Sequence, residues 1–311
     1  MMKLTKKLTK KAASHLLFAL VVLLALSSLA FAETVTVTHN LGTATVVKNP
    51  EKVVVFDYAI LDSLDQMGVE ILGLPKSNIP EFLKKFEAPK YINVGTLFEP
   101  NFELIYELEP DVIFISGRQE TVYKELAEIA PTVYLAIDTN DYLGSFEKNL
   151  TVLGEIFGKE EFVKAEVAKV RSSIEEVSRK VREKGASALI LMANDGSLSV
   201  YGPGSRFDII HSEFGFKPAD PNIQVANHGQ NISFEYLLKI NPEYILVIDR
   251  GATVGGSISA QQVMDNVLVR STDAYKKNRI IYLTSQVWYV ASGGLEGTKT
   301  MIEDIEKAIE N

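Results

Sequence analysis

Hydrophobic and polar residues alternate along this chain in two ways, and together they predict an α/β fold. Residues 33–47 alternate threonine and valine on either side of Asn40-Leu41-Gly42, a pattern typical of a small hairpin. From Val53 onwards, short apolar runs typical of buried strands are followed by segments whose apolar residues have helical spacing. Strands that alternate with helices favour parallel sheets, so we expect parallel α/β sheets here.

The expected elements can be placed by residue number. Strands are expected at 53–56, 112–116, 132–135, 188–192, 244–248 and 279–283, with shorter strand-like runs at 71–75 and 91–95. Helices are expected at 61–67, 101–108, 122–129, 206–215, 261–267 and 295–309. Residues 251–259 are rich in glycine and serine, which favours a loop.

Two segments that lie 132 residues apart have similar sequences. Residues 102–118 read FELIYELEPDVIFISGR, residues 234–250 read FEYLLKINPEYILVIDR, and five of the 17 positions are identical. Each segment predicts a helix, a break at proline and a strand followed by an arginine, Arg118 or Arg250. We therefore expect two lobes of like construction, each presenting an arginine to a shared cleft. Such a cleft would suit an anion.

The segment between the repeats predicts a connector. Residues 144–184 carry no strand pattern and read as two helices interrupted near Gly158, the second of them long and charged. We expect an N-terminal lobe over 33–158, a connecting helix over 159–185 and a C-terminal lobe over 186–311. The alternative is that this helix is an ordinary surface helix of one lobe.

The first 32 residues have the pattern of a cleaved secretory signal peptide. Five lysines precede an apolar stretch from Leu16 to Leu26, and small residues at Ala30 and Ala32 form the expected cleavage site. Cleavage would change the net charge from −8 to −13, because the segment holds five lysines and no acidic residue. An acidic chain argues against nucleic acid as a partner and makes arginines gathered in a cleft conspicuous.

Cysteine is absent from the sequence, which excludes disulfides, thiolate metal sites and cysteine nucleophiles. It also leaves no cysteine for lipid attachment after the signal segment. We therefore expect a chain exported to the periplasm of a Gram-negative cell, neither anchored to nor embedded in the membrane, and monomeric.

Three arginines are the main candidates for binding. Ligands of open α/β sheets lie beyond the carboxyl ends of the strands, where Arg118 and Arg250 are expected. Arg206 follows Gly202-Pro203-Gly204 in a loop that is expected to open a helix, so that backbone N–H groups and a guanidinium would point the same way. A guanidinium is always charged and weakly hydrated, which suits a partly dry anion site. For each of them alone, a solvated surface residue is the plain alternative.

Two further residues carry donor atoms suited to iron. His228 lies in a polar loop before the second repeat, and Tyr289 lies between the last strand and the last helix. Imidazole is a common metal ligand, and phenolate oxygen suits ferric iron. His39 and His211 are expected to be structural. The sequence holds no G-x-S-x-G, H-E-x-x-H or Walker A motif.

These residues together resemble one protein family. The matching motifs are Pro100 to Asp111, Ile115 to Gln119, Gly202 to Phe207, Asn227 to Gly229, Val247 to Arg250 and Trp288 to Gly293. The chain resembles the periplasmic iron–siderophore binding proteins of ABC importers, whose two lobes are joined by one long helix, and within them the catecholate-binding subgroup. The resemblance covers essentially all of the chain after residue 32.

The resemblance implies a role for each candidate residue. Arg118, Arg206 and Arg250 would bind catecholate oxygens, and His228 and Tyr289 would complete the iron shell of a tetradentate ligand. Ferric iron would be cargo, bound as its siderophore complex, and no permanent cofactor is implied. Glu103 and Glu235, at equivalent places in the repeats, would dock onto an ABC permease. The permease, its ATPase and an outer-membrane receptor are the implied partners.

Two other hypotheses for the function remain open. The same fold could carry haem, cobalamin or a hydroxamate siderophore, and a haem carrier would need no cluster of three arginines. A secreted siderophore esterase would need an activated serine such as Ser205 or Ser292, but no accompanying His–Asp pair is evident in the sequence. We therefore expect a binding protein, not an enzyme, with no catalytic residues.

Overall fold

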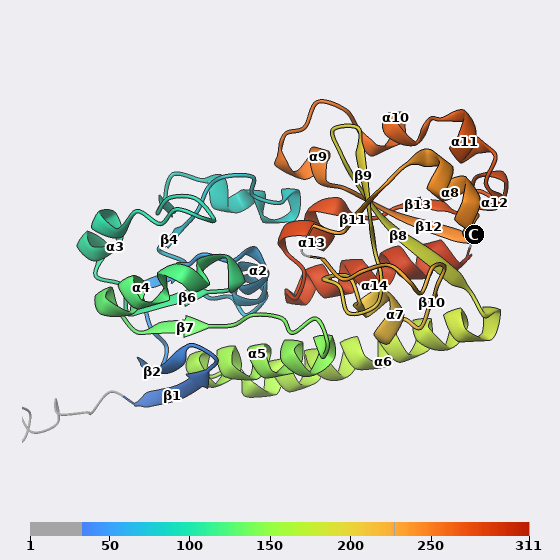
Figure 1. The fold of residues 1–311 in the computed structure, drawn as a ribbon. Helices are drawn as coiled ribbons and strands as arrows, with labels where there is room; N and C mark the ends of the chain where they lie inside the picture. The colour runs from blue at the N-terminus through green and yellow to red at the C-terminus, as the bar shows by residue number, and fades with distance from the viewer. Residues whose placement is uncertain (1–32, 227, 311) are drawn as a thin grey trace, which may run out of the picture. The chain divides into compact units, whose positions relative to one another are not determined.

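The structure, a computed structural model, describes residues 33–226 and 228–310, which form two β-sheets with helices around them and one hairpin (Figure 1). The predicted signal segment, residues 1–32, lies outside the described residues. The hairpin is formed by β1 (Thr34–His39) and β2 (Gly42–Val47), as predicted. Within the described ranges, the structure contains no helix that combines the length and apolar character needed to span a bilayer.

The first sheet is parallel throughout and has the strand order β5-β4-β3-β6-β7. Its strands are β3 (Val53–Val55), β4 (Gly73–Leu74), β5 (Ile92–Asn93), β6 (Val112–Ile115) and β7 (Thr132–Tyr134). The helices of this half are α2 (Tyr58–Gln66), α3 (Phe102–Leu108), α4 (Tyr123–Ile129) and the 3₁₀ segments η1 (Glu81–Glu87) and η2 (Gly117–Val122). The predicted strands are confirmed to within a residue or two. Helix α2 begins at Tyr58, three residues before the predicted start at Leu61, because the Asp57 side chain caps its N-terminus.

The second sheet is mixed, so the prediction of parallel sheets is confirmed for the first sheet and only in part for the second. Its strands are β8 (Ser187–Asn194), β9 (Ser197–Tyr201), β10 (Lys217–Pro218), β11 (Gln230–Ile232), β12 (Tyr244–Asp249) and β13 (Ile280–Tyr282). Strands β8, β12 and β13 are parallel, but β9 is antiparallel to β8 and β11 to β9. The reason lies in Asp195-Gly196, whose φ angles of 45° and 87° form a tight turn between β8 and β9.

The helices of the second half depart from prediction at several places. They are α7 (Ile209–Ser212), α8 (Phe234–Ile240), α9 (Arg250–Val254), α10 (Ala260–Met264), α11 (Val267–Arg270), α12 (Asp273–Lys276), α13 (Ser285–Val290) and α14 (Leu295–Glu310). The helix expected at 261–267 ends at Met264, and residues 267–276 and 285–290 contain short helices that were not predicted. The helix expected at 206–215 is a single turn, because Gly204 N–H bonds to the Asp208 carboxylate and holds the preceding residues in a turn. The expected loop at 251–259 begins with α9, because Asp249 caps that helix by accepting from Ala252 N–H at 2.8 Å.

The sequence repeat is confirmed as a structural repeat. Helices α3 and α8 have equal lengths, and their N-caps, Asn101 and Ser233, lie 132 residues apart. Their C-caps, Glu109 and Asn241, both adopt the left-handed conformation with φ of 48°. Each helix leads into an interior strand of its sheet, β6 or β12. The same local construction therefore occurs once in each half.

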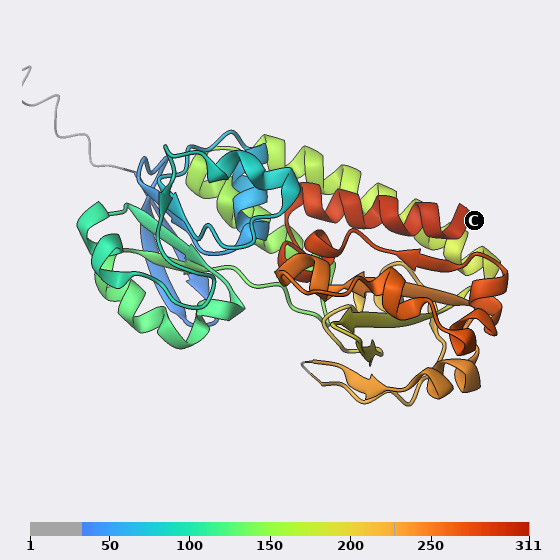
Figure 2. The ribbon, with the colours of Figure 1, turned by 90° about the horizontal axis from the view of Figure 1, so that it is seen from above.

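Two long helices connect the halves in sequence. Helix α5 (Tyr142–Phe157) ends at Gly158, and α6 (Glu160–Lys184) follows, as predicted. The buried apolar residues of α6 have helical spacing: Val163, Val167, Val170, Ile174, Val177 and Val181. This face packs against α5 and α14, and Figure 2 shows α6 and α14 running side by side. The division into lobes at 158 and 185 stays a prediction.

The two sheets share one apolar core. Val53 and Val55 of β3 face the same large cluster as Leu246 and Ile248 of β12, together with side chains of α5, α6 and α14. Side chains alternate between the two faces of a strand, so Val54, between Val53 and Val55, points to the other face of the first sheet. There it packs in a separate apolar cluster. The inner faces of both sheets are therefore joined through the long helices.

Candidate ligand-binding site

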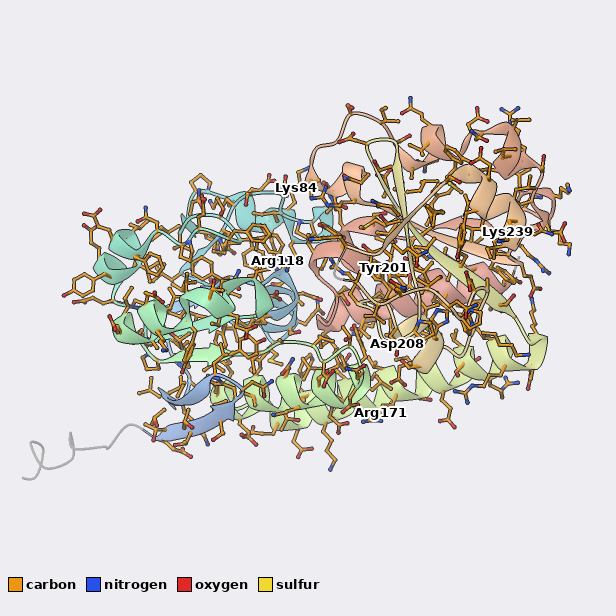
Figure 3. All side chains as sticks on the ribbon, in the orientation of Figure 1. Lys84, Arg118, Arg171, Tyr201, Asp208 and Lys239 are labelled. Atoms are coloured by element: carbon orange, nitrogen blue, oxygen red, sulfur yellow. The ribbon has the colours of Figure 1, made fainter. Side chains whose placement is uncertain are left out.

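Arg118 is held in place by the turn that follows β6. Ser116 N–H donates to Gln119 Oε1 at 3.1 Å, and the fully buried Gln119 amide donates to the carbonyl oxygens of Phe56 and Leu97. The turn therefore fixes Arg118 at the edge of the first half that faces the second (Figure 3). Its guanidinium lies 3.7 Å from Asp57, which also accepts from the Ser116 hydroxyl.

Arg250 opens α9, directly after β12. Its Nη1 donates to Asn194 Oδ1 at 2.7 Å, and its Nε donates to the Tyr289 hydroxyl at 2.7 Å. Asn194 is the last residue of β8, which pairs with β12. The guanidinium is thus oriented from two sides, at the carboxyl ends of neighbouring parallel strands.

Arg206 reaches the same place from the turn before α7. Its guanidinium carbon lies 5.0 Å from the ring centre of Phe207 and 4.8 Å from that of Tyr289. Such stacking on aromatic faces orients a guanidinium without using its N–H donors. Partial desolvation, and next the nearby charge of Arg118, lower the pKa of Arg206, which nevertheless stays protonated at neutral pH.

The three predicted arginines all contact Tyr289. The carbonyl oxygen of Tyr289 accepts from Arg118 at 3.2 Å and from Arg206 at 2.8 Å, while its hydroxyl accepts from Arg250. Arg118 comes from the first half, and the other two come from the second. Three positive charges held this close raise the local potential and attract anions, although the chain as a whole is acidic.

A cavity of about 560 Å³ adjoins this cluster. Arg118, Arg206 and His228 line it, and so does Trp288, but Arg250 and Tyr289 do not. His228 is exposed to solvent. The remaining wall includes residues of α2, α5 and the segment after β7. The structure therefore brings one imidazole and two of the three arginines to one hollow, while the third arginine contacts the Tyr289 hydroxyl outside the cavity lining.

The donor set does not form a metal site of its own. Across residues 33–226 and 228–310, no three or more His, Cys, Asp and Glu side chains are grouped as a metal site would require.

The other sequence candidates lie elsewhere. Glu103 and Glu235 are exposed in the first turns of α3 and α8, where a carboxylate is favoured by the helix N-terminus. His39 Nε2 lies 3.2 Å from the Thr132 carbonyl, and His211 Nδ1 lies 2.9 Å from that of Phe216. Both histidines thus contact backbone carbonyls, and neither lines the cavity.

Some residues of the site were missed by sequence reasoning. Asp57 and Asn194 contact Arg118 and Arg250, and each lies at or just past the end of a parallel strand, where polar residues could have been considered. Tyr201 packs edge-on against Phe207, with ring centres 4.8 Å apart, and burial raises its pKa to about 12. Tyr201, labelled in Figure 3, thus packs against the residue that follows Arg206.

Comparison with known proteins places this architecture in a family. The model of the periplasmic binding protein family matches residues 53–287, which include both repeats and all three arginines. The chain belongs to this family. Its members are two-lobed α/β binding proteins, so the predicted fold class is confirmed, and the family is one of substrate-binding proteins.

Several relatives are similar over most of their length. The petrobactin-binding protein YclQ of Bacillus subtilis is 46% identical over 283 residues, 89% of each chain. Its crystal structure superimposes with a TM-score of 0.87 over 90% of this chain and 99% of that one. The ferric-anguibactin-binding protein FatB of Vibrio anguillarum is 34% identical over 89% of this chain and 88% of its own. The catecholate-siderophore binding protein VctP of Vibrio cholerae is 36% identical, with a TM-score of 0.85 over 88% and 100% of the two chains.

Proposed function

We propose that this protein captures a ferric catecholate siderophore and delivers it to an inner-membrane ABC permease. The observation that carries the proposal is the convergence of Arg118, Arg206 and Arg250 on Tyr289. A ferric catecholate is a compact anion with several charged oxygens at its surface. Guanidinium groups from both halves can neutralise such a complex while the halves hold it between them.

His228 and Tyr289 would act only for some ligands. Octahedral ferric iron has six positions, so a tetradentate chelator leaves two that one imidazole and one phenolate would fill. A hexadentate chelator leaves none, and the two side chains would then be idle. Arg250 donates to the Tyr289 hydroxyl and would offset part of the charge that a phenolate carries. This arrangement supports the iron-ligand role proposed for Tyr289.

Delivery would use the repeated helices. Glu103 and Glu235 occupy the same position of α3 and α8, and the residues three places further on, Tyr106 and Leu238, are 71% and 38% exposed. Each half thus presents a carboxylate with an exposed apolar side chain one turn later on the helix. Two like surfaces of this kind suit a permease, coupled to its ATPase, that offers two arginine pockets.

The proposed setting follows from the same role. The protein would work as a monomer in a Gram-negative periplasm after removal of residues 1–32, and it would receive cargo that an outer-membrane receptor has imported. It would not be an enzyme: Ser205 is 3% exposed, and neither it nor Ser292 has a histidine among its hydrogen-bond partners in the described residues.

Binding can be tested by the fluorescence of Trp288, which lines the cavity and is the single tryptophan of the chain. Ferric catecholate should quench it at sub-micromolar concentration. Replacing Arg118, Arg206 or Arg250 by Ala should weaken binding roughly 10- to 150-fold each, because a hydrogen bond to a charged group contributes about 1.5–3 kcal/mol. Arg270→Ala, whose guanidinium pairs with Asp265 away from the cavity, is the matched control.

One outcome of this titration would contradict the proposed function. If ferric catecholate neither quenches Trp288 nor gives a calorimetric signal, the proposal fails. Ferric hydroxamate, haem and cobalamin belong in the same titration. Tight binding of one of these, with little loss in the arginine variants, would assign the cleft to that cargo instead.

A further inference from the structure

The cavity beside the arginines has a second, apolar character. Its wall includes Ile60 of α2, Leu150 and Leu153 of α5, and Leu135 and Ile137 of the segment after β7. Trp288 adds to this surface, because its indole N–H is directed at Asp304 at 2.9 Å and is occupied there. Guanidinium groups therefore border a hollow in which apolar side chains gather on one part of the wall, beside polar residues such as Ser63 and Asn149.

The iron chelate alone would not fill this hollow. A complex held by all three arginines must lie against Arg250 and Tyr289, and neither of these lines the cavity. The chelate is therefore placed at the part of the cavity that Arg118, Arg206 and His228 line, and the cavity of about 560 Å³ continues from there along the apolar residues. Another part of the ligand is needed to exclude water from the apolar wall.

A second anionic group does not suit this space. The Asp57 carboxylate lies in the cavity wall, 3.7 Å from Arg118, and already offsets part of the positive charge that a second anion would need there. Hydrocarbon does suit it, because burial of apolar surface against an apolar wall is favourable in proportion to the area removed from water.

We infer that this cavity is a subsite for an uncharged aliphatic segment of the siderophore, a linker or tail attached to its catecholate groups. The inference rests on the proposed function and narrows it: the preferred ligand is an extended molecule with an anionic chelating end and a methylene chain. The arginines would bind the anionic chelating end, and residues of α2, α5 and the segment after β7 would contact the methylene chain.

The test uses ligands with one chelating group and variable chains. The probes are ferric complexes of N-alkyl catecholamides with alkyl chains of two, four and six carbons, titrated calorimetrically into the intact protein. Each added methylene should tighten binding about fourfold until the wall is covered. Ile137→Asn, at a half-buried loop position, should flatten this dependence on chain length.

Two further variants make the result specific. Ala136→Phe places a ring in the cavity that Ala136 lines, and should weaken the longest probe selectively. Val267→Asn is the control for Ile137→Asn, because Val267 is 72% exposed on α11 and does not line the cavity. It should retain the full dependence on chain length.

The outcomes separate the two proposals. Equal affinity of the three probes for the unaltered protein would overturn the subsite and leave catecholate binding intact. A chain-length dependence that persists in both Ile137→Asn and Ala136→Phe would also overturn it, because the gain would then arise elsewhere. Failure of every probe to bind would contradict the proposed function itself.

Discussion

At the scale of residues, the site depends on how one tyrosine arranges three arginines. The backbone carbonyl of Tyr289 accepts from Arg118 and Arg206, and its hydroxyl accepts from Arg250. A guanidinium has five N–H donors, so these contacts orient the groups and leave donors for a ligand. The arginines could be chosen from the sequence by their place after strands, but their common partner could not.

Ligands of different denticity should show whether Tyr289 and His228 coordinate the iron. Tyr289→Phe keeps the backbone carbonyl that Arg118 and Arg206 contact and removes only the phenolic oxygen. We expect Tyr289→Phe and His228→Ala each to weaken a tetradentate ferric catecholate about tenfold or more and to leave a hexadentate one unchanged. Calorimetry gives the affinities, and the visible absorption of the iron reports loss of the phenolate ligand.

Equal losses for both kinds of ligand would show that these side chains contact the chelator or support the cleft, and that they do not coordinate iron. Tyr275→Phe, at an exposed position of α12, is a control for the loss of a phenol.

At the scale of elements, the link between α2 and α14 joins the two halves. Gly297 N–H, in the first turn of α14, donates to the buried Asp62 carboxylate of α2 at 2.8 Å, and Leu295 N–H donates to Ser63. Gly294 permits the approach, since a Cβ there would lie 2.2 Å from Asp62. Burial raises the pKa of Asp62 to about 7, against the opposing effect of the backbone N–H groups of α14.

Stability should therefore depend on pH through Asp62. Between about pH 4 and 7 the folded protein keeps a proton that the unfolded chain has lost, so the free energy of unfolding falls as pH rises through this window. The contribution is at most about 4 kcal/mol, since each pKa unit corresponds to 1.36 kcal/mol. Asp62→Asn removes the titration, and its stability relative to the unaltered protein should rise from about pH 4 to about pH 8.

Urea unfolding of both proteins at the two pH values measures this difference. Asp265→Asn, at an exposed carboxylate that pairs with Arg270, controls for the general effect of removing an acid. A stability difference between Asp62→Asn and the unaltered protein that is the same at both pH values would contradict the prediction.

Helices and strands were predicted correctly where the pattern of neighbouring residues determines them. The α3–β6 and α8–β12 units, the break at Gly158 and the final helix all follow from local periodicity. Prediction failed for β9 and β11, which were not predicted as strands. Strand β9 is antiparallel because Asp195-Gly196 form a tight turn after β8, and β11 pairs with β9 from a distant part of the chain.

At the scale of the whole molecule, the halves are joined by a shared core. The inner faces of both sheets meet side chains of α5, α6 and α14 in one apolar cluster, so large separation of the halves would expose that surface. A long helix also gives less freedom than loop hinges that absorb large backbone changes. Ligand capture should therefore proceed with small adjustments of the lobes.

Solution scattering can check this expectation. We expect the radius of gyration to stay the same, within experimental error, when saturating ferric catecholate is added. Fluorescence quenching on the same sample would establish that the site is filled. A clear decrease on saturation would show wide closure and contradict the connector role of α6.

The sequence by itself determined the alternation of strands and helices, the repeat at 132 residues and the arginines after two strands, because each is written in the order of neighbouring residues. Tertiary structure decided that Arg118 and Arg206 share the carbonyl of Tyr289, although 171 and 83 residues separate them from it. It also decided that the Asp62 carboxylate accepts from a backbone N–H of α14, and which apolar side chains meet in the wall of the cavity. Contacts between distant residues depend on how packed elements bring them together, which local patterns do not specify.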